Sequence, residues 1–283
     1  MKFRSLVIVF LLMVALCMRA EVVHVFTFQK ASNRVHFGVE MLSNALKSAG
    51  YSVDNAVPKI RLGNEKFIIV IEKNDPSLKR ILKQLNVQLP DSMKKEGFFI
   101  ATKKNTTLIC GSDGNGAIYG CREIIDRLLN SNKLDLPVSF NDAPEMVMRG
   151  TCIGVQKTTY LPGRTVYEYP YTPETFPWFY DKKQWIEYLD MLVANRMNSL
   201  YLWNGHPFAS LVKLKDYPFA VEVDDATFKK NEEIYSFLTR EADKRGIFVI
   251  QMFYNIIVSK PFAEHYGIAT QDRNRPITPL ISD

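Results

Sequence analysis

The feature that most constrains the fold is an alternation of short apolar runs and helical segments in the second half of the chain. Residues 147–153, 198–203 and 247–253 each have the length and apolar content of a strand. Between them, apolar residues recur at helical spacing. Alternating strands and helices form parallel sheets, because each helix returns the chain to the same end of the sheet. We therefore expect residues 146–283 to form the first three units of a β/α barrel.

Two helices are expected between these strands. Asp181 and Gln184 have the spacing of a capping box, which marks the start of the first helix. Trp185 and Leu189 then fall on its apolar face. The second helix should end at Gly246, since glycine readily adopts the left-handed conformation that closes many helices.

The chain before Pro144 carries strand and helix signals of its own, which predict a separate α+β domain over residues 22–140, joined to the barrel part through residues 141–145. A β-hairpin is expected within residues 97–111, and Asp113 should cap the helix that follows. The other expected elements are strands at residues 21–28 and 67–71 and helices at residues 34–49 and 75–85. Together they predict a small mixed-sheet domain.

A glycine-rich loop, residues 111–116, lies between the hairpin and this helix. Its spacing differs from the dinucleotide-binding pattern, because Tyr119 stands where the third glycine would be, and no lysine follows as in a phosphate-binding loop. We interpret the loop as a tight turn from strand to helix. No nucleotide cofactor is expected.

Residues 1–20 have the organisation of a secretory signal peptide. Two basic residues precede an unbroken apolar run, residues 6–16, which is too short to span a bilayer comfortably. We expect cleavage after Ala20 and a secreted or periplasmic protein. A lipid anchor at Cys17 is disfavoured, because Leu16 is too large for the position before a lipidated cysteine.

Charge, cysteine and histidine content limit the partners further. The formal net charge of +6 falls to +3 without residues 1–20, which hold three basic residues and no acidic one. A balance this weak gives little indication of a nucleic-acid partner or a membrane surface. Cys110, Cys121 and Cys152 are an odd number without paired spacing, which favours buried free thiols over a disulfide framework. The four histidines are scattered, so no metal site is expected.

In the first half, one series of motifs runs in a characteristic order. It comprises Glu96-Gly97-Phe98-Phe99-Ile100, Ile109-Cys110-Gly111-Ser112-Asp113, Gly116-Ala117-Ile118-Tyr119-Gly120 and residues 124–129. The series resembles the N-terminal domain of two glycoside hydrolase groups, the family-20 β-N-acetylhexosaminidases and the family-67 α-glucuronidases. The resemblance covers about residues 22–140. It implies a domain that flanks a catalytic barrel and carries no catalytic group.

The second half continues this resemblance. Arg149-Gly150 is similar to the first barrel strand of the hexosaminidases, whose arginine binds sugar hydroxyls, and Asn198-x-Leu200 and Gly246-Ile247-x-Val249 are similar to the next two strands. Two features depart from the family. Gly154 stands where the family has an aspartate, and Gln251-Met252-Phe253-Tyr254 replaces a run of proline, glutamate, isoleucine and aspartate. The resemblance to the clan is therefore stronger than the resemblance to either activity.

The resemblance also implies where the catalytic carboxylates lie. In those families they belong to the fourth strand and later ones, whereas residues 146–283 cover three strands of a fold that needs about 250 residues. We therefore expect the catalytic residues beyond the end of this sequence, and this chain alone to be inactive. Glycoside hydrolysis needs a positioned carboxylic acid. Nothing in the sequence identifies one among the loop residues Glu168, Glu174, Asp216 and Glu222.

The candidate substrate-binding residues lie at or near expected strand ends, where barrel enzymes place their sites. They are Arg149, Trp203, Asn204, His206, Tyr254 and Asn255. Trp203 can offer an aromatic face to a sugar ring, and Arg149 and Asn204 can bond to its hydroxyls. Two simpler alternatives stay open, a structural ion pair for Arg149 and a structural role for His206.

The loop of residues 155–180 is long and rich in aromatic residues. Loops of this length are usually functional, and aromatic faces stack on the apolar faces of sugar rings. The alternative is that these aromatic residues pack against their own domain. The sequence favours neither.

These observations favour a secreted glycoside hydrolase, of which this chain is the N-terminal part, acting on glycans that contain hexosaminides or glucuronides. A non-catalytic carbohydrate-binding or interaction protein on the same scaffold is the alternative, and a structural protein without a ligand is a third possibility. The expected partner is a glycan, and no cofactor is expected. A reading frame that continues past Asp283 into a fourth strand with an acidic residue would favour the enzyme.

Overall fold

The computed structural model describes residues 21–56, 65–155, 170–204, 209–253 and 258–268. The chain divides into two compact units, Met1–Glu145 and Met146–Asp283, each with a sheet of its own. The expected signal peptide, residues 1–20, lies outside the described residues. Among the helices of the described ranges, none combines the length and the hydropathy that a bilayer crossing requires.

The first unit is built on a six-stranded mixed sheet with the order β2-β1-β3-β5-β4-β6. Strands β1, β2, β3 and β5 run parallel, whereas β4 is antiparallel to both β5 and β6. Their bounds are Val22–Phe26 (β1), Ser52–Asp54 (β2), Lys66–Glu72 (β3), Phe98–Lys103 (β4), Thr106–Gly111 (β5) and Ser139–Asp142 (β6). The β4–β5 pair is the predicted hairpin, and the mixed sheet is confirmed.

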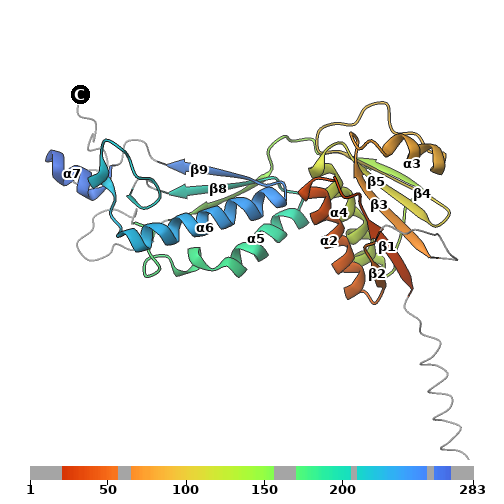
Figure 1. Cartoon of the computed structure of the whole chain (residues 1–283), viewed down its shortest axis with the longest axis horizontal. Coiled ribbons are helices and arrows are strands. Elements are labelled where there is room, and N and C mark those ends of the chain that lie inside the picture. Colours follow the sequence, from red (N-terminus) through yellow and green to blue (C-terminus); the bar gives the residue numbers. More distant parts are fainter. Residues whose placement is uncertain (1–20, 57–64, 156–169, 205–208, 254–257, 269–283) are drawn as a thin grey trace, which may run out of the picture. The chain divides into compact units, whose positions relative to one another are not determined.

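Helices cover both faces of this sheet (Figure 1). α2 (Asn33–Ser48) and α4 (Gly114–Ser131) lie side by side on one face. On the other face, the buried side of α3 (Leu78–Leu85) packs against β1, β3 and β5. Because both faces are covered, all five central residues of β3 are buried, which explains its unbroken apolar sequence.

The predicted tight turn between strand and helix joins β5 to α4. Asp113 is the N-cap, and its side chain accepts a hydrogen bond from Gly116 N. A Cβ on Gly111 would lie 2.2 Å from Ala117 N, and one on Gly116 would lie 2.1 Å from Gly97 O. These glycines are therefore required by close backbone packing, and the loop needs no phosphate ligand to explain it.

The second unit is a three-stranded parallel sheet, β7-β8-β9, with α5 and α6 on one face (Figure 1). The bounds are Gly150–Gly154 (β7), Pro177–Tyr180 (η1), Lys182–Ala194 (α5), Ser199–Asn204 (β8), Pro218–Ala220 (η3), Asp225–Lys244 (α6), Phe248–Phe253 (β9) and Lys260–Tyr266 (α7). The chain is thus an α/β protein whose second unit is a sector of a β/α barrel, as the alternation of runs predicts.

The expected helix ends in this unit are present. Asp181 accepts hydrogen bonds from the backbone N–H groups of Lys183 and Gln184, so it caps α5, although its own N–H donates to Trp178 O instead of completing a capping box. α6 ends before Gly246, which has the expected positive φ of 71°.

The two faces of this sheet differ. On the helix side, the hydroxyls of Thr151 and Tyr188 are 2.6 Å apart, Leu200 and Leu202 are buried, and the Tyr235 hydroxyl donates to Gln251. The residues that alternate with these point to the opposite face, which no described element covers. They include Cys152, Trp203, Phe248 and Met252, which are all exposed. In a β/α barrel this face lines the interior.

Two expectations about element ends are wrong, and two short strands were not expected. The first barrel strand begins at Gly150 and not at residue 147, because the side chain of Asn198 binds Arg149 N and Val147 O, so these backbone groups have a side-chain partner before the strand begins. The helix expected to open at Asp75-Pro76 begins only at Leu78. The short edge strands β2 and β6 were not expected, since most of their residues are exposed and carry no apolar pattern.

Candidate functional site

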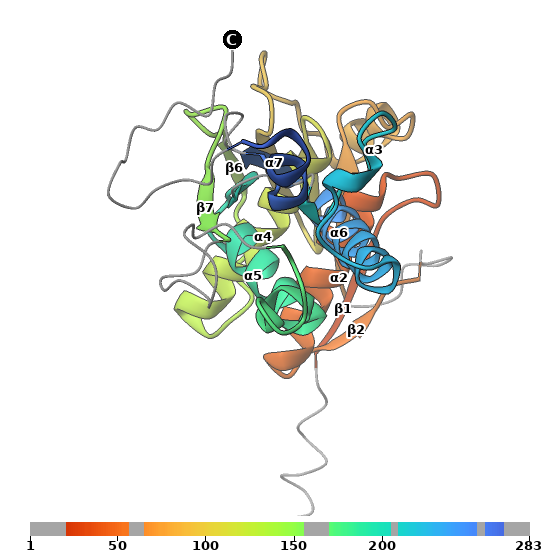
Figure 2. The same ribbon diagram turned by 90° about the vertical axis from the view of Figure 1, so that its left-hand side faces the viewer.

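The carboxyl ends of β8 and β9 point to the same end of the second unit, and Figure 2 views the unit from that end, with α7 nearest the viewer. The strand register aligns Gly154, Trp203 and Met252 side by side on the uncovered face, near the carboxyl ends of the three strands. This end is where β/α barrel enzymes bind their substrates. We therefore place the candidate site at the carboxyl ends of β7, β8 and β9.

Trp203 is the best-placed of the predicted residues. Its neighbour Leu202 points to the helices and is 1% exposed, whereas Trp203 is 40% exposed on the uncovered face. Its backbone carbonyl accepts a hydrogen bond from Val155 N at 2.7 Å, which fixes the start of the loop after β7. An exposed indole on a rigid strand can stack on a sugar ring. Asn204 is the last residue of β8, at the expected strand end.

Arg149 lies at the other end of the unit, and the expected placement of this residue is wrong. It precedes β7, and its guanidinium donates to backbone carbonyls, through Nε to Arg196 O at 2.9 Å and through a terminal nitrogen to Met146 O at 2.7 Å. These contacts tie the chain entering β7 to the turn after α5. Both of these acceptors are backbone carbonyl oxygens, which gives Arg149 a structural role. Sugar binding by Arg149 stays a prediction.

The remaining predicted residues, His206, Tyr254 and Asn255, lie outside the described residues. Of the long aromatic loop, residues 170–180 are described, and their aromatic side chains favour the packing alternative. Tyr171, Phe176 and Phe179 are at most 3% exposed, and Phe179 is also in ring contact with Trp185 of α5. These rings form part of the core of the second unit rather than a sugar-binding surface.

A buried polar network fixes this loop. The side-chain amide of Asn231, a fully buried residue of α6, donates to Tyr171 O at 2.9 Å and to Ser210 O at 3.0 Å. Its oxygen accepts from the Tyr180 hydroxyl. Ser210 Oγ in turn accepts from Tyr171 N at 2.8 Å. One side chain thus joins α6 to the chain segments that follow β7 and β8.

The contacts of the described candidate loop carboxylates single out none of them as a general acid. Glu174 is exposed, and hydrogen bonds from its own backbone N–H and from Thr172 lower its pKa. Glu222 accepts a hydrogen bond from Lys260 N at 2.7 Å, a structural contact between two loops. Asp216 is exposed, and Glu168 lies outside the described residues.

The cysteines follow the expectation in two of three cases. Cys110 and Cys121 are free and buried, and burial raises the pKa of the Cys110 thiol to about 12. Cys152 is free but exposed, because it faces the uncovered side of β7, so the expectation of a buried thiol is wrong there. Within the described residues, no group of three or more histidine, cysteine or acidic side chains could hold a metal ion.

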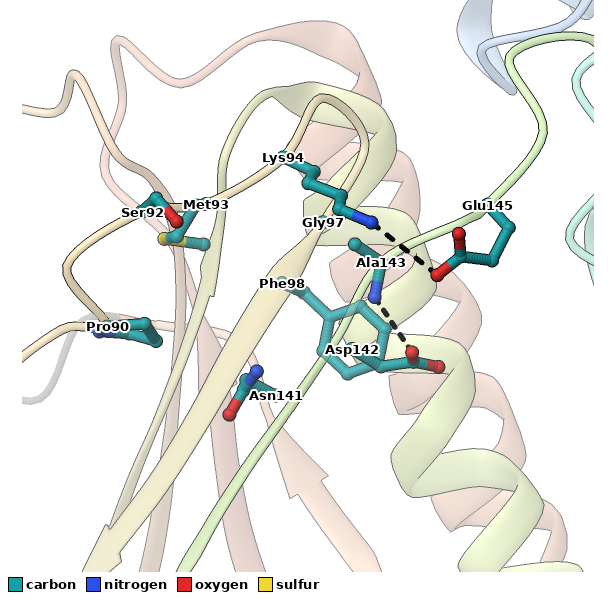
Figure 3. Close-up of a pocket in the computed structure, with 10 residues that line it drawn as sticks. All are labelled: Pro90, Ser92, Met93, Lys94, Gly97, Phe98, Asn141, Asp142, Ala143 and Glu145. Carbon is teal, nitrogen blue, oxygen red and sulfur yellow. Dashed lines mark hydrogen bonds and ion pairs between the residues drawn. The ribbon is translucent and has the colours of Figure 1, made fainter.

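The first unit has a surface pocket of about 270 Å³ (Figure 3). Its lining residues are Pro90, Ser92, Met93, Lys94, Gly97, Phe98, Asn141, Asp142, Ala143 and Glu145. Lys94 Nζ lies 3.5 Å from Glu145 Oε1, and Asp142 Oδ1 accepts from Ala143 N at 2.8 Å. The Phe98 ring is only 3% exposed and so offers little surface for stacking. The pocket can donate and accept hydrogen bonds, but it lacks an aromatic face.

Comparison with known proteins identifies the enzyme class that this fold resembles. No family model and no curated protein matches the chain. Among solved structures, the chain is similar to one described as a GH138 enzyme targeting pectin rhamnogalacturonan II, with 60% identity and a TM-score of 0.77 over 92% of this chain. The chain spans 35% of the length of that enzyme.

A second solved structure is more distant. The chitobiase of Flavobacterium johnsoniae, a family-20 enzyme, has 15% identity and a TM-score of 0.52, with 88% of this chain and 33% of that one covered, which shows a shared fold alone. Both matches are glycoside hydrolases, so the resemblance to this class is confirmed. The family expected from the motifs differs from that of the structure with 60% identity, which is GH138 rather than family 20 or 67.

Proposed function

We propose that this chain is the N-terminal part of a GH138-type glycoside hydrolase that acts on a pectic polysaccharide of the rhamnogalacturonan II class. The observation that carries the proposal is the 60% identity to the GH138 enzyme over 92% of the chain. The hexosaminides and glucuronides suggested by the sequence motifs are the less favoured substrates, because the family-20 enzyme reported above has only 15% identity to the chain.

The geometry of the second unit supports a role in substrate binding. Trp203 is exposed at the carboxyl end of β8, on the face that lines the interior in a complete barrel. The Asn231 network and the buried aromatic residues hold the neighbouring loop segments in place, as a preorganised binding surface requires. In this proposal Trp203 stacks on a sugar ring at the carboxyl end of β8.

The acid and base that cleave the glycosidic bond are proposed to lie on further strands of the barrel. Hydrolysis requires a positioned carboxylic acid and, in most families, a second carboxylate. Glu174 and Glu222, two of the candidate loop acids, are engaged in local hydrogen bonds that suit structural roles. We propose that the protein is exported by a signal peptide, residues 1–20, since a wall polysaccharide lies outside the cell.

The test compares the 283-residue chain with the product of the longest reading frame that contains it. Both are incubated with purified rhamnogalacturonan II, and released sugars are identified by mass spectrometry. We expect the longer product to release a sugar and the shorter chain to release none. Hydrolysis of hexosaminides or glucuronides but not of rhamnogalacturonan II would refute the substrate. Binding of the polysaccharide without hydrolysis by either protein would favour the non-catalytic alternative.

A further inference from the structure

Five aromatic side chains form a cluster in the second unit, which we call the aromatic platform: Tyr217, Phe219, Phe262, His265 and Tyr266. Phe219 is stacked on His265 with ring centroids 4.1 Å apart, and on Phe262 at 6.0 Å. Tyr266 contacts Phe262 at 4.8 Å, and Tyr217 contacts Phe262 at 5.5 Å. The two tyrosines thus share the Phe262 ring as a common support.

The platform is built from the two segments that follow the carboxyl ends of β8 and β9. η3 follows β8 and α7 follows β9, so both lie after the carboxyl ends of parallel strands (Figures 1 and 2). Two contacts hold the loops together. Glu222 accepts a hydrogen bond from the first backbone N–H of α7, and the Phe219 ring of η3 stacks on Phe262 of α7. Ala220 of η3 and Ala263 of α7 are buried.

The tyrosines are more exposed than core packing would leave them. Tyr266 is 54% exposed and Tyr217 is 39% exposed, whereas Phe219 and Phe262 are half-buried. The inner rings therefore account for the packing of η3 on α7, and the two tyrosine rings remain available to a ligand. Phe262 and Tyr266 are four residues apart on α7, which places them on the same face of the helix.

We propose that the aromatic platform binds a pyranose ring of the polysaccharide substrate, with the face of Tyr266 stacked on the C–H face of the sugar and Tyr217 at its edge. The electron-rich face of an aromatic ring attracts such C–H groups, and a phenolic hydroxyl can bond to a sugar hydroxyl. This inference rests on the proposed function, since it assumes that a glycan reaches this end of the strands. It adds a second stacking surface besides Trp203.

The experiment measures binding of rhamnogalacturonan II oligosaccharides to the full 283-residue chain by isothermal titration calorimetry. Tyr266→Ala should weaken binding by about threefold to tenfold, the range expected for loss of one aromatic contact. Tyr266→Phe retains the ring and should bind within about twofold of the original chain. Leu129→Ala is the control, because Leu129 is 62% exposed on α4 of the first unit and lies outside the platform. Unfolding of each variant in urea shows whether the fold is retained.

Trp203→Ala separates this inference from the proposed function. If Trp203→Ala weakens binding while Tyr266→Ala, correctly folded, does not, the platform is refuted and the glycan site at Trp203 stands. If Tyr266→Phe binds as weakly as Tyr266→Ala, the hydroxyl and not ring stacking carries the contact, and the stacking geometry is refuted. If no oligosaccharide binds to the original chain, the platform and its role at the proposed site are both refuted. Weakening by Tyr266→Ala alone among the Tyr266 and Leu129 variants supports the platform.

Discussion

Replacing Asn231 by alanine tests whether one buried amide holds the loops of the candidate site. Asn231 is fully buried, and its side chain makes three hydrogen bonds, to Tyr171 O, to Ser210 O and with the Tyr180 hydroxyl. Asn231→Ala removes the shared partner of all three groups. Burial also raises the pKa of Tyr180 well above its ordinary value of 10.0, so its hydroxyl remains protonated and available as a donor at neutral pH.

The expected loss of unfolding free energy follows from the three groups that Asn231→Ala leaves without this partner. A buried polar group that loses its hydrogen bond costs about 1–3 kcal/mol, and some of this cost is recovered when a group finds another partner or water enters. We therefore expect Asn231→Ala to lower the free energy of unfolding of the second unit by about 2–4 kcal/mol. With a urea dependence of about 2 kcal/mol per M, the midpoint should fall by about 1–2 M.

Tryptophan fluorescence during urea unfolding measures this effect in the correct unit. The three tryptophans of the chain, Trp178, Trp185 and Trp203, all lie in the second unit. Asn195→Ala is the matched control, since the Asn195 amide donates to Met191 O at 2.9 Å but is exposed. It should cost less than about 0.5 kcal/mol. Equal midpoints for the two variants would refute the structural role of Asn231.

Three further predictions concern other parts of the chain. Gly150→Ala should destabilise the second unit by about 1–3 kcal/mol, because the added Cβ would lie 1.9 Å from the backbone carbonyl oxygen of Ser199 in β8. Gly154→Ala in the same strand is the control in the same urea titration and should be near neutral, because its Cβ would meet no atom within 4 Å. Hydrogen bonds from Thr227 lower the pKa of Asp224, so the stability that this carboxylate contributes is present above its ordinary pKa of 3.8 and is lost as the pH falls through the lower pKa of the folded state. The loss of unfolding free energy caused by Asp224→Ala should therefore shrink in acid, and a loss that does not change with pH would contradict this. Of Cys152 and Cys110, only exposed Cys152 should react with a thiol reagent in the native protein, as peptide mapping by mass spectrometry can show; modification of Cys110 at a similar rate would contradict its burial.

The local signals in the sequence predicted much of the fold, because they have local physical causes. The β4–β5 hairpin and the helix cap at Asp113 depend on residues within a few positions of each other. Arg149 shows where such reasoning fails. Met146, Val147 and Met148 look like the start of a buried strand, but they are exposed, and the edge of the strand is set by the distant side chain of Asn198.

The candidate site was predicted less completely than the fold. The position of Trp203 at a strand end followed from the apolar run that precedes it, and its exposed face followed from the alternation of residues along a strand. The aromatic platform was missed, because its rings come from two loops that only the folded chain brings together. The spacing of Phe262 and Tyr266 on a short helix was the available signal.

A crystal structure of the longest-reading-frame product with a bound rhamnogalacturonan II oligosaccharide would test directly whether the glycan binds at Trp203. We expect a sugar ring at the carboxyl ends of β8 and β9, with carbon atoms within about 4.5 Å of the Trp203 ring. An oligosaccharide bound productively elsewhere, with Trp203 covered by protein side chains, would contradict it.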